Sequence, residues 1–256
     1  MLHNLSPKKV LAAADPLLVK MYGQRPWRRH GDGVEVLVRT ILSQSTNEIG
    51  GDAAYEKLRR CWPTWDGLAD APPSVVARVI RIGGLARLKA GYICGALRKI
   101  RAERGQIDLE FLASLPLEEA TGYLRQFDGV GPKTADCVLS FAFHMPTFPV
   151  DTHIFLIARR LTVIPRGTSL EQAHEMLTGL IAPARRYAMH KLLIEHGRQL
   201  CLARHPHCGR CLLLEICPTG QRHEGISTRK PGVRQLVRRR RRRTVDGEQP
   251  GDRAKT

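Results

Sequence analysis

Apolar residues recur at helical spacing along most of this chain, and that periodicity limits its possible folds more than any other feature. Val34, Leu37, Val38, Ile41 and Leu42 are one example. Residues three and four positions apart lie on the same face of an α-helix. Alternation of apolar and polar residues, the pattern of a half-buried strand, is nearly absent. The sequence therefore predicts an all-α fold.

Further helices are expected where this spacing recurs or where a capping signal begins it. The pattern returns from Ala90 to Leu97, and Ser169 followed by Gln172 is a capping box ahead of another apolar stripe. The other expected helices span residues 47–61, 74–81, 116–126, 132–144, 151–162 and 186–200. No internal repeat is present.

The chain is strongly basic, and the excess charge has two locations. Its 256 residues carry 41 Lys and Arg against 24 Asp and Glu, a net charge of +17. Residues 219–256 hold +8 of this, including the run Arg238 to Arg243, which leaves +9 on the rest. Because the tail alone does not explain the charge, we expect part of the folded surface to bind a polyanion such as nucleic acid.

Composition also limits the class and location of the protein. An apolar share of 43% excludes a wholly disordered chain, although the polar composition of residues 219–256 predicts a disordered basic tail. No apolar run approaches the roughly 18 residues of a membrane span, and Asp15 and Pro16 interrupt the first apolar stretch. We expect a soluble cytoplasmic monomer with no membrane partner. The arginine run, interpreted here as a nucleic-acid arm, leaves a nuclear location as the alternative.

Four of the seven cysteines crowd into seventeen residues with the spacing C-x6-C-x2-C-x5-C: Cys201, Cys208, Cys211 and Cys217. So dense a set in a chain of intracellular character favours a metal site over disulfides. One close pair flanked by single cysteines favours an iron–sulfur cluster, while a zinc site that recruits His205 or His207 remains open. We expect the other three cysteines, Cys61, Cys94 and Cys137, to be small buried hydrophobic residues.

A Gly129-Val130-Gly131 turn joins two expected helices and is a candidate phosphate site. Glycine adopts backbone conformations closed to other residues and leaves no side chain between the backbone amides and a phosphate. Pro132 suits the first position of the next helix, whose N-terminus attracts anions. An ordinary glycine corner between two helices is the alternative.

Two charged residues near this turn are candidates for catalysis. Lys133 lies in the first turn of the second helix, where the helix dipole disfavours a cation and so favours the neutral, nucleophilic amine. Asp151 begins a later amphipathic helix, where it either caps the helix or stabilises a developing cation. A phosphate-steering surface lysine is the alternative for Lys133.

The three motifs together resemble endonuclease III, of the helix-hairpin-helix DNA glycosylase superfamily. They are Gly129-Val-Gly-Pro-Lys-Thr-Ala135, Val150-Asp-Thr-His-Ile-Phe155 and the four-cysteine loop, and the resemblance runs from about residue 34 to 218. It implies a six-helix domain at residues 25–145 with the hairpin, and a domain of residues 1–24 and 146–218 that holds a [4Fe–4S] cluster through the four cysteines.

The resemblance also implies an activity. The family removes oxidised pyrimidines from duplex DNA in base excision repair and then cleaves the strand as an AP lyase, so double-stranded DNA with damaged pyrimidines or abasic sites is the expected partner. Lys133 matches the nucleophile that forms a Schiff base before β-elimination, and Asp151 matches its paired aspartate. The damaged base is extruded, as chemistry on a stacked base requires.

The residues that the resemblance assigns to DNA contact lie in several segments. Gln44 aligns with a residue inserted into the gap left by the flipped nucleotide, and Leu85 aligns with an apolar wedge. The hairpin residues Gly129, Val130, Gly131 and Thr134, together with His153, complete the expected set. Asp128 departs from the proline that commonly precedes the first hairpin glycine.

Two other functions are compatible with part of this pattern. A mismatch-specific adenine or thymine DNA glycosylase shares the four-cysteine pattern, but the adenine enzymes have a catalytic glutamate near position 40, where this chain has Thr40, and usually lack the lysine. A non-catalytic DNA-binding module would explain the charge and the glycine turn. The presence of both Lys133 and Asp151 argues against it.

Overall fold

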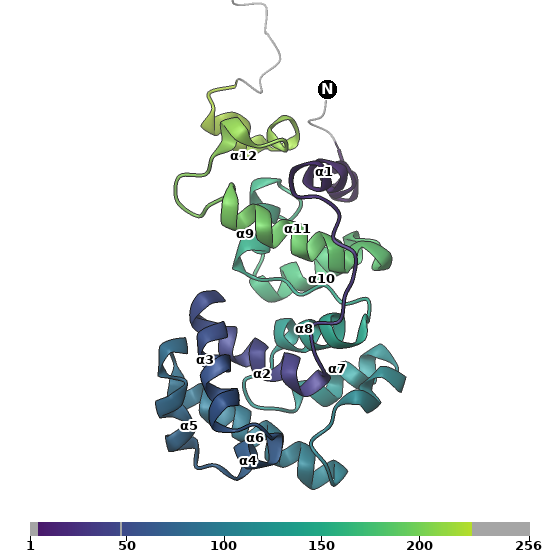
Figure 1. Ribbon diagram of the computed structural model, residues 1–256. Coiled ribbons are helices and arrows are strands. Elements are labelled where there is room, and N and C mark those ends of the chain that lie inside the picture. Colours follow the sequence, from purple (N-terminus) through teal and green to yellow (C-terminus); the bar gives the residue numbers. More distant parts are fainter. Residues whose placement is uncertain (1–4, 47, 227–256) are drawn as a thin grey trace, which may run out of the picture.

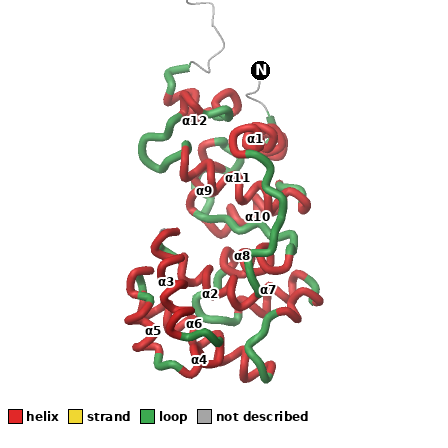
Figure 2. Tube along the Cα trace, viewed as in Figure 1, coloured by secondary structure: helices red, strands yellow, loops and turns green. Residues whose placement is uncertain are grey.

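The computed structural model describes residues 5–46 and 48–226. Within these ranges the chain forms α-helices and short 3₁₀ helices but no strand (Figure 2). This confirms the predicted all-α class. None of the described helices is long and apolar enough to cross a membrane.

The helices follow one another in the chain order shown in Figure 1. The α-helices are α1 (Pro7–Tyr22), α2 (Gly33–Ser43), α3 (Glu48–Cys61), α4 (Trp65–Asp70), α5 (Pro73–Val79), α6 (Ala86–Arg104), α7 (Leu117–Arg125), α8 (Pro132–Phe143), α9 (Thr152–Arg160), α10 (Leu170–Leu180), α11 (Arg186–Gln199) and α12 (Pro218–His223). The 3₁₀ helices are η1 (Arg81–Gly83), η2 (Glu110–Ser114), η3 (Pro183–Arg185), η4 (Cys208–Arg210) and η5 (Leu214–Ile216).

The helices gather in two groups, each around its own hydrophobic core. We call α2 to α8 the hairpin lobe, and α1 with α9 to α12 the cysteine lobe; the hairpin lobe lies lower in Figure 1. In the hairpin lobe α2 packs mainly on α8 and α3, and in the cysteine lobe α9 and α1 both pack on α11. The division into folding domains at residues 25–145, and 1–24 with 146–218, stays a prediction.

Helix α1 is absent from the helices expected from the sequence, because Asp15 and Pro16 interrupt its apolar pattern. The structure accommodates Pro16 inside the helix. A proline there removes one backbone hydrogen bond and strains the preceding turn. Burial of Ala14 and Leu18, each 0% exposed, against the cysteine lobe offsets this cost.

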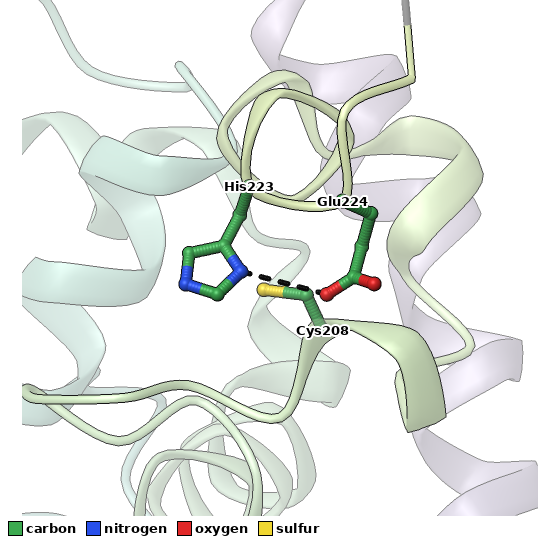
Figure 3. Close-up of side chains that lie close together, drawn as sticks. All are labelled: Cys208, His223 and Glu224. Carbon is green, nitrogen blue, oxygen red and sulfur yellow. Dashed lines mark hydrogen bonds and ion pairs between the residues drawn. The ribbon is translucent and has the colours of Figure 1, made fainter.

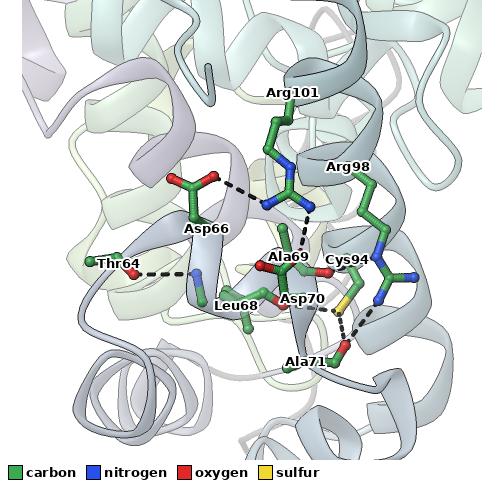
Figure 4. A network of polar contacts seen from close by, with 10 residues as sticks. Thr64, Asp66, Leu68, Ala69, Asp70, Ala71, Cys94, Arg98 and Arg101 are labelled. Atoms are coloured by element: carbon green, nitrogen blue, oxygen red, sulfur yellow. Dashed lines mark hydrogen bonds and ion pairs between the residues drawn. The ribbon is translucent and has the colours of Figure 1, made fainter. Parts of the chain in front are cut away.

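Helix α4 is also absent from the expected helices, and contacts from α6 hold it in place (Figure 4). Arg98 donates to the carbonyls of Ala69 at 2.6 Å and Ala71 at 3.0 Å, at the C-terminal end of α4. A cation at this end satisfies carbonyls that have no partner in the helix. Six residues are too few to show helical periodicity, so this helix depends on tertiary contacts.

The segment between α1 and α2 runs from the cysteine lobe down to the hairpin lobe (Figure 1). The Trp27 indole donates to the Ser140 carbonyl at 2.9 Å, and the backbone of His30 donates to the Phe141 carbonyl at 3.1 Å. The His30 ring also pairs with the Tyr187 hydroxyl at 2.8 Å. The segment therefore fixes α8 and α11 relative to each other, next to the candidate site.

The described chain continues past the expected start of the tail. Residues 219–223 lie in α12, so the prediction of disorder from residue 219 is wrong for this stretch. The Gln221 amide explains the order, because it donates to the carbonyls of Leu214 and Glu215 at 3.1 and 2.7 Å. The run Arg238 to Arg243 lies outside the described residues.

Candidate active site and cysteine cavity

Helices α7 and α8 form the predicted hairpin, and its two glycines differ in what they require. Gly129 has a φ of +76°, and a Cβ there would lie 2.2 Å from Cδ2 of Tyr92. Gly131 has a φ of −85°, and nothing lies within 4 Å of its Cβ position. Only Gly129 therefore needs glycine for its conformation, and the expectation of a special backbone at Gly131 is wrong.

The hairpin amides that remain available for an anion lie on the glycines. The Val130 amide is not one of them, because it donates to the Phe127 carbonyl at 3.1 Å and Val130 is only 6% exposed. In the described chain no acceptor engages the amides of Gly129 and Gly131, and Gly131 caps the N-terminus of α8. Free amides at a helix N-terminus suit a phosphate oxygen.

Gln44 and Thr134, both expected to contact DNA, contact each other. The Gln44 side-chain amide donates to the Gly129 carbonyl at 2.8 Å and to the Thr134 hydroxyl at 3.2 Å. Thr134 is only 4% exposed, so its hydroxyl holds Gln44 against the hairpin and presents little surface of its own. The structure thus brings the predicted gap-filling residue to the hairpin turn.

Lys133 and Asp151 share their surroundings with a buried thiol. Cys137, one helical turn after Lys133, contacts the lysine side chain and lies within electrostatic range of Asp151. Burial raises the pKa of the Cys137 thiol, so it stays neutral beside the amine. The sequence suggested only a packing role for Cys137, since its contact with Lys133 follows from the pitch of α8.

Asp151 is the N-cap of α9, which was one of the two roles that the sequence allowed for it. The cap uses only one of its two carboxylate oxygens. Its Oδ1 accepts from the Ile154 amide at 2.8 Å, and Oδ2 makes no hydrogen bond within the described chain. His153 is half buried, packed closely against Gly197 of α11. Its contact with DNA stays a prediction.

His190, which the sequence analysis did not identify, supports the turn that leads to Asp151. Its Nδ1 donates to the Pro149 carbonyl at 2.8 Å, and the residue is 4% exposed. Burial lowers the pKa of His190 to about 3, and the charge of Lys133 contributes. The ring is therefore neutral at physiological pH. One of two histidines in a helix of mixed polar and apolar composition gives no signal of this role.

Leu85, the expected wedge, projects from the turn that precedes α6. It has a φ of +45°, which is unusual for a residue with a side chain, and is 54% exposed. Ile82 and Leu88, at 53% and 55% exposure, flank it in sequence. An exposed apolar edge on a strained turn has the shape that a wedge requires, and its insertion into DNA stays a prediction.

The four cysteines of the loop line one cavity in the cysteine lobe: Cys201, Cys208, Cys211 and Cys217. Most of the remaining lining is apolar, including Ile157, Leu161 and Leu213. Burial raises the pKa of the Cys211 thiol to about 11, and the other three cysteines add to the rise. A metal centre would lower the pKa values of these thiols again, because the metal charge stabilises bound thiolates.

Nitrogen donors surround the sulfurs, which strengthens the case for metal-bound thiolates. Arg160 lies 3.1 Å from the Cys201 sulfur, the Gly220 amide lies 3.3 Å from that of Cys217, and His196 lies 3.6 Å from that of Cys211. Donors of this kind stabilise thiolate ligands and orient them. The donor set therefore fits a cluster held by four cysteines.

The histidines of the zinc alternative are placed differently. His205 does not line the cavity, whereas His207 does. Figure 3 shows a separate group in which Cys208, His223 and Glu224 lie close together, with 3.5 Å between the His223 ring and the Glu224 carboxylate. This group shares Cys208 with the larger set and leaves out the other three cysteines.

The three cysteines outside the loop were all expected to be buried. This prediction is confirmed for Cys94 and Cys137, which are buried, and is wrong for Cys61, which is exposed at the end of α3.

Comparisons with known proteins identify the family of this chain. A model of the HhH-GPD superfamily of base excision DNA repair proteins matches residues 38–183. Endonuclease III of Escherichia coli K12 is 32% identical over 183 residues, which cover 72% of this chain and 82% of that protein. An Arabidopsis thaliana protein named as a DNA glycosylase is 38% identical over 63% of this chain, which spans only 55% of the plant protein.

The solved structures show the same relationship. An endonuclease III in a non-covalent complex with DNA superposes with a TM-score of 0.74 at 25% identity, over 85% of this chain and 98% of the other. The chain belongs to the helix-hairpin-helix superfamily of base excision DNA repair proteins. Within it the chain belongs to the endonuclease III family and is an enzyme of the DNA glycosylase class.

Proposed function

We propose that this enzyme releases oxidised pyrimidines from duplex DNA and then cleaves the strand at the abasic site. The observation that carries the proposal is the neighbourhood of Lys133 and Asp151. Lys133, at the start of α8, contacts the buried Cys137, and Asp151, at the start of α9, lies within electrostatic range of the same thiol. A nucleophile paired with a group that stabilises a cation suits displacement at a sugar carbon.

The proposed chemistry begins at the side-chain nitrogen of Lys133. Its nitrogen attacks C1′ of the deoxyribose as the bond from C1′ to the base breaks, and the base leaves with a proton. Ring opening gives a Schiff base between Lys133 and C1′. Loss of a C2′ proton then expels the 3′ phosphate by β-elimination, and water releases the lysine.

Asp151 would support both stages. While Oδ1 holds the start of α9, the second oxygen is available to stabilise the positive charge that develops on the sugar and to move protons. The hairpin amides of Gly129 and Gly131 would hold a phosphate near the lesion. The relatives' names support DNA as partner, and we propose that the enzyme acts as a cytoplasmic monomer.

Borohydride reduction on a duplex containing thymine glycol tests this function. The wild type should release the base, cut the strand and yield a covalent adduct, because borohydride reduces a Schiff base to a stable amine. In Lys133→Gln the adduct and the cut should both disappear. Release of mispaired adenine or thymine without an adduct would favour a mismatch glycosylase, and DNA binding without chemistry would favour a binding module.

We also propose that Cys201, Cys208, Cys211 and Cys217 hold a [4Fe–4S] cluster with a structural role. When bound, the cluster would tie the loop of residues 201–217 to α9 and α12 through its four thiolates. Purified protein should be yellow-brown, with about four irons per chain and a broad visible absorbance. A colourless protein with one zinc would contradict the cluster.

A further inference from the structure

Lys89, on the first turns of α6, is a buried lysine with no part in the chemistry described above. It is 1% exposed and is one of the largest fully buried side chains in the described part of the chain. Burial lowers the pKa of this amine. A lysine is seldom buried unless its ammonium group is fully hydrogen-bonded.

The ammonium group of Lys89 meets three oxygen acceptors. Its nitrogen lies 2.7 Å from the Leu42 carbonyl, 2.7 Å from the Thr46 hydroxyl and 2.6 Å from the Gly83 carbonyl. Three acceptors match the three N–H donors of an ammonium group. The protonated side chain is therefore satisfied without being exposed.

These acceptors belong to two separate segments of the chain. Leu42 is in the last turn of α2 and Thr46 follows it, so both flank Gln44. Gly83 ends η1, two residues before Leu85. Helix ends leave carbonyls without partners, and a cation there is favourable. Thr46 adds a second link, because its hydroxyl also donates to the Gly83 carbonyl.

Each of the two linked segments contains a residue with a strained backbone conformation, so contacts are needed to hold both segments in place. Ser45 and Leu85 have φ values of +51° and +45°, conformations that cost a residue with a side chain about 1 kcal/mol or more. Surrounding contacts must hold such conformations in place. The hydrogen bonds of the Lys89 ammonium group are contacts of this kind, because their acceptors lie in both segments.

We propose that Lys89 is a positioning residue that locks the Gln44 turn and the Leu85 turn into one rigid device for opening DNA. The inference rests on the proposed function only in that Gln44 and Leu85 enter the duplex. Lys89 touches neither the reacting sugar nor Lys133. It sets the spacing of the two inserted side chains, so that they enter adjacent steps of the helix together.

Replacement of Lys89 by methionine tests the proposal. Met retains most of the apolar stem and removes the ammonium group. The matched control is Lys99→Met, the same change at a partly exposed position of α6, where the ammonium group lies 3.9 Å from Glu103 and 5.9 Å from the centre of the Phe127 ring. A second variant, Thr46→Val, removes the linking hydroxyl and keeps the lysine. It decides the matter if Lys89→Met does not fold.

The main readout is the fluorescence of 2-aminopurine placed opposite a tetrahydrofuran abasic analogue, which rises when the base unstacks. The analogue has no hydroxyl at C1′ and so cannot form a Schiff base, which keeps strand cleavage out of the signal. Saturating Lys89→Met, shown to be folded by its thermal transition, should give a clearly smaller rise than wild type. Base release from duplex thymine glycol should slow about 10- to 100-fold, because a shift of a positioning group by about 1 Å can lower the rate by up to about 100-fold. Thr46→Val should lower both the fluorescence rise and the rate of base release. Lys99→Met should match wild type in both measurements.

A folded Lys89→Met with wild-type fluorescence overturns the proposal, as does an equal loss in Lys99→Met. A wild type that gives no fluorescence rise overturns it as well. If the wild type unstacks the duplex but releases no base, the proposed function fails. The fluorescence comparison then still decides whether Lys89 positions the two turns.

Discussion

Asp151 shows how one residue can serve both folding and chemistry. The sequence left open whether it caps α9 or acts in catalysis, and the structure shows that the cap uses one of its two carboxylate oxygens. The other oxygen makes no hydrogen bond within the described chain. The two interpretations are therefore compatible, and a substitution can separate them.

Asp151→Asn should separate them. Asparagine caps helices about as well as aspartate, so the midpoint of thermal unfolding should change little. Base release from thymine glycol should fall by about 100-fold or more, because the charge that stabilises the cation is lost. Single-turnover kinetics and a thermal scan of the same sample would check this. Wild-type turnover in the variant would remove Asp151 from the mechanism.

The two hairpin glycines provide a matched pair for stability. Gly129→Ala should lower the free energy of unfolding by about 1–3 kcal/mol, since the new methyl group meets the Tyr92 ring and the backbone is left-handed. Gly131→Ala has open space and an ordinary φ, so its effect should stay within about 0.5 kcal/mol. Urea denaturation measures both. Equal losses would contradict this assignment.

His190 should make the fold sensitive to acid. Its pKa is about 3 in the folded chain against 6.5 for an ordinary histidine, so the unfolded state binds more protons between these values. Its contribution to stability is complete above pH 6.5 and falls by up to about 1.4 kcal/mol per unit as the pH drops toward 3. His190→Asn should flatten the profile of unfolding free energy against pH. An unchanged slope would contradict the buried neutral ring.

Some contacts at the residue scale could not be predicted from the sequence. Lys133 and Asp151 stood out because their motifs are local. Lys89 did not, because its three acceptors come from positions 42, 46 and 83, and only the packing of α2, η1 and α6 brings them together. Gln44 was identified by resemblance, but its bond to the Gly129 carbonyl likewise depends on the tertiary fold.

At the scale of elements, local signals predicted helices well where the cap or the period was strong. The capping box at Ser169 and Gln172 is present in full, with bonds of 3.1 and 2.9 Å. Helices α8, α9 and α11 lie within one or two residues of the expected ranges. Helices α1 and α4 escaped prediction because a proline breaks one pattern and the other helix is shorter than two turns.

The dependence of α4 on α6 can be measured. Arg98→Met should lower the free energy of unfolding by about 1 kcal/mol, because the charged hydrogen bonds to the carbonyls of Ala69 and Ala71 are lost at a partly exposed site. Arg87→Met, an exposed change on the same helix, is the control and should be neutral. A neutral Arg98→Met would show that α4 holds its place without this arginine.

At the scale of the whole molecule, positive charge is divided between the folded body and the tail. Residues 227–256 carry +8, so their removal leaves +9 on the described part of the chain and its few flanking residues. The two lobes and the segment of residues 23–32 between them hold the hairpin, the wedge turn and Asp151 within one framework. We therefore expect the body alone to bind DNA specifically.

Truncation after Ile226 tests this division. Nonspecific affinity for duplex DNA should weaken, and the slope of log K against log salt should become shallower by about 0.9 for each lost phosphate contact. Base release at low salt should stay close to that of the full chain, since the catalytic residues remain. Fluorescence anisotropy at several salt concentrations measures the slope. An identical slope would show that the arginine run does not act as a DNA arm.

The proposed mechanism requires that the Lys133 amine becomes covalently attached to the sugar of the lesion. The most direct test is to reduce the reaction on an abasic-site duplex with borohydride, digest the adduct and locate the sugar by mass spectrometry. The modified peptide should contain Lys133, with the modification on its side-chain nitrogen. Attachment at another amine, or no attachment while the strand is still cut, would contradict this mechanism.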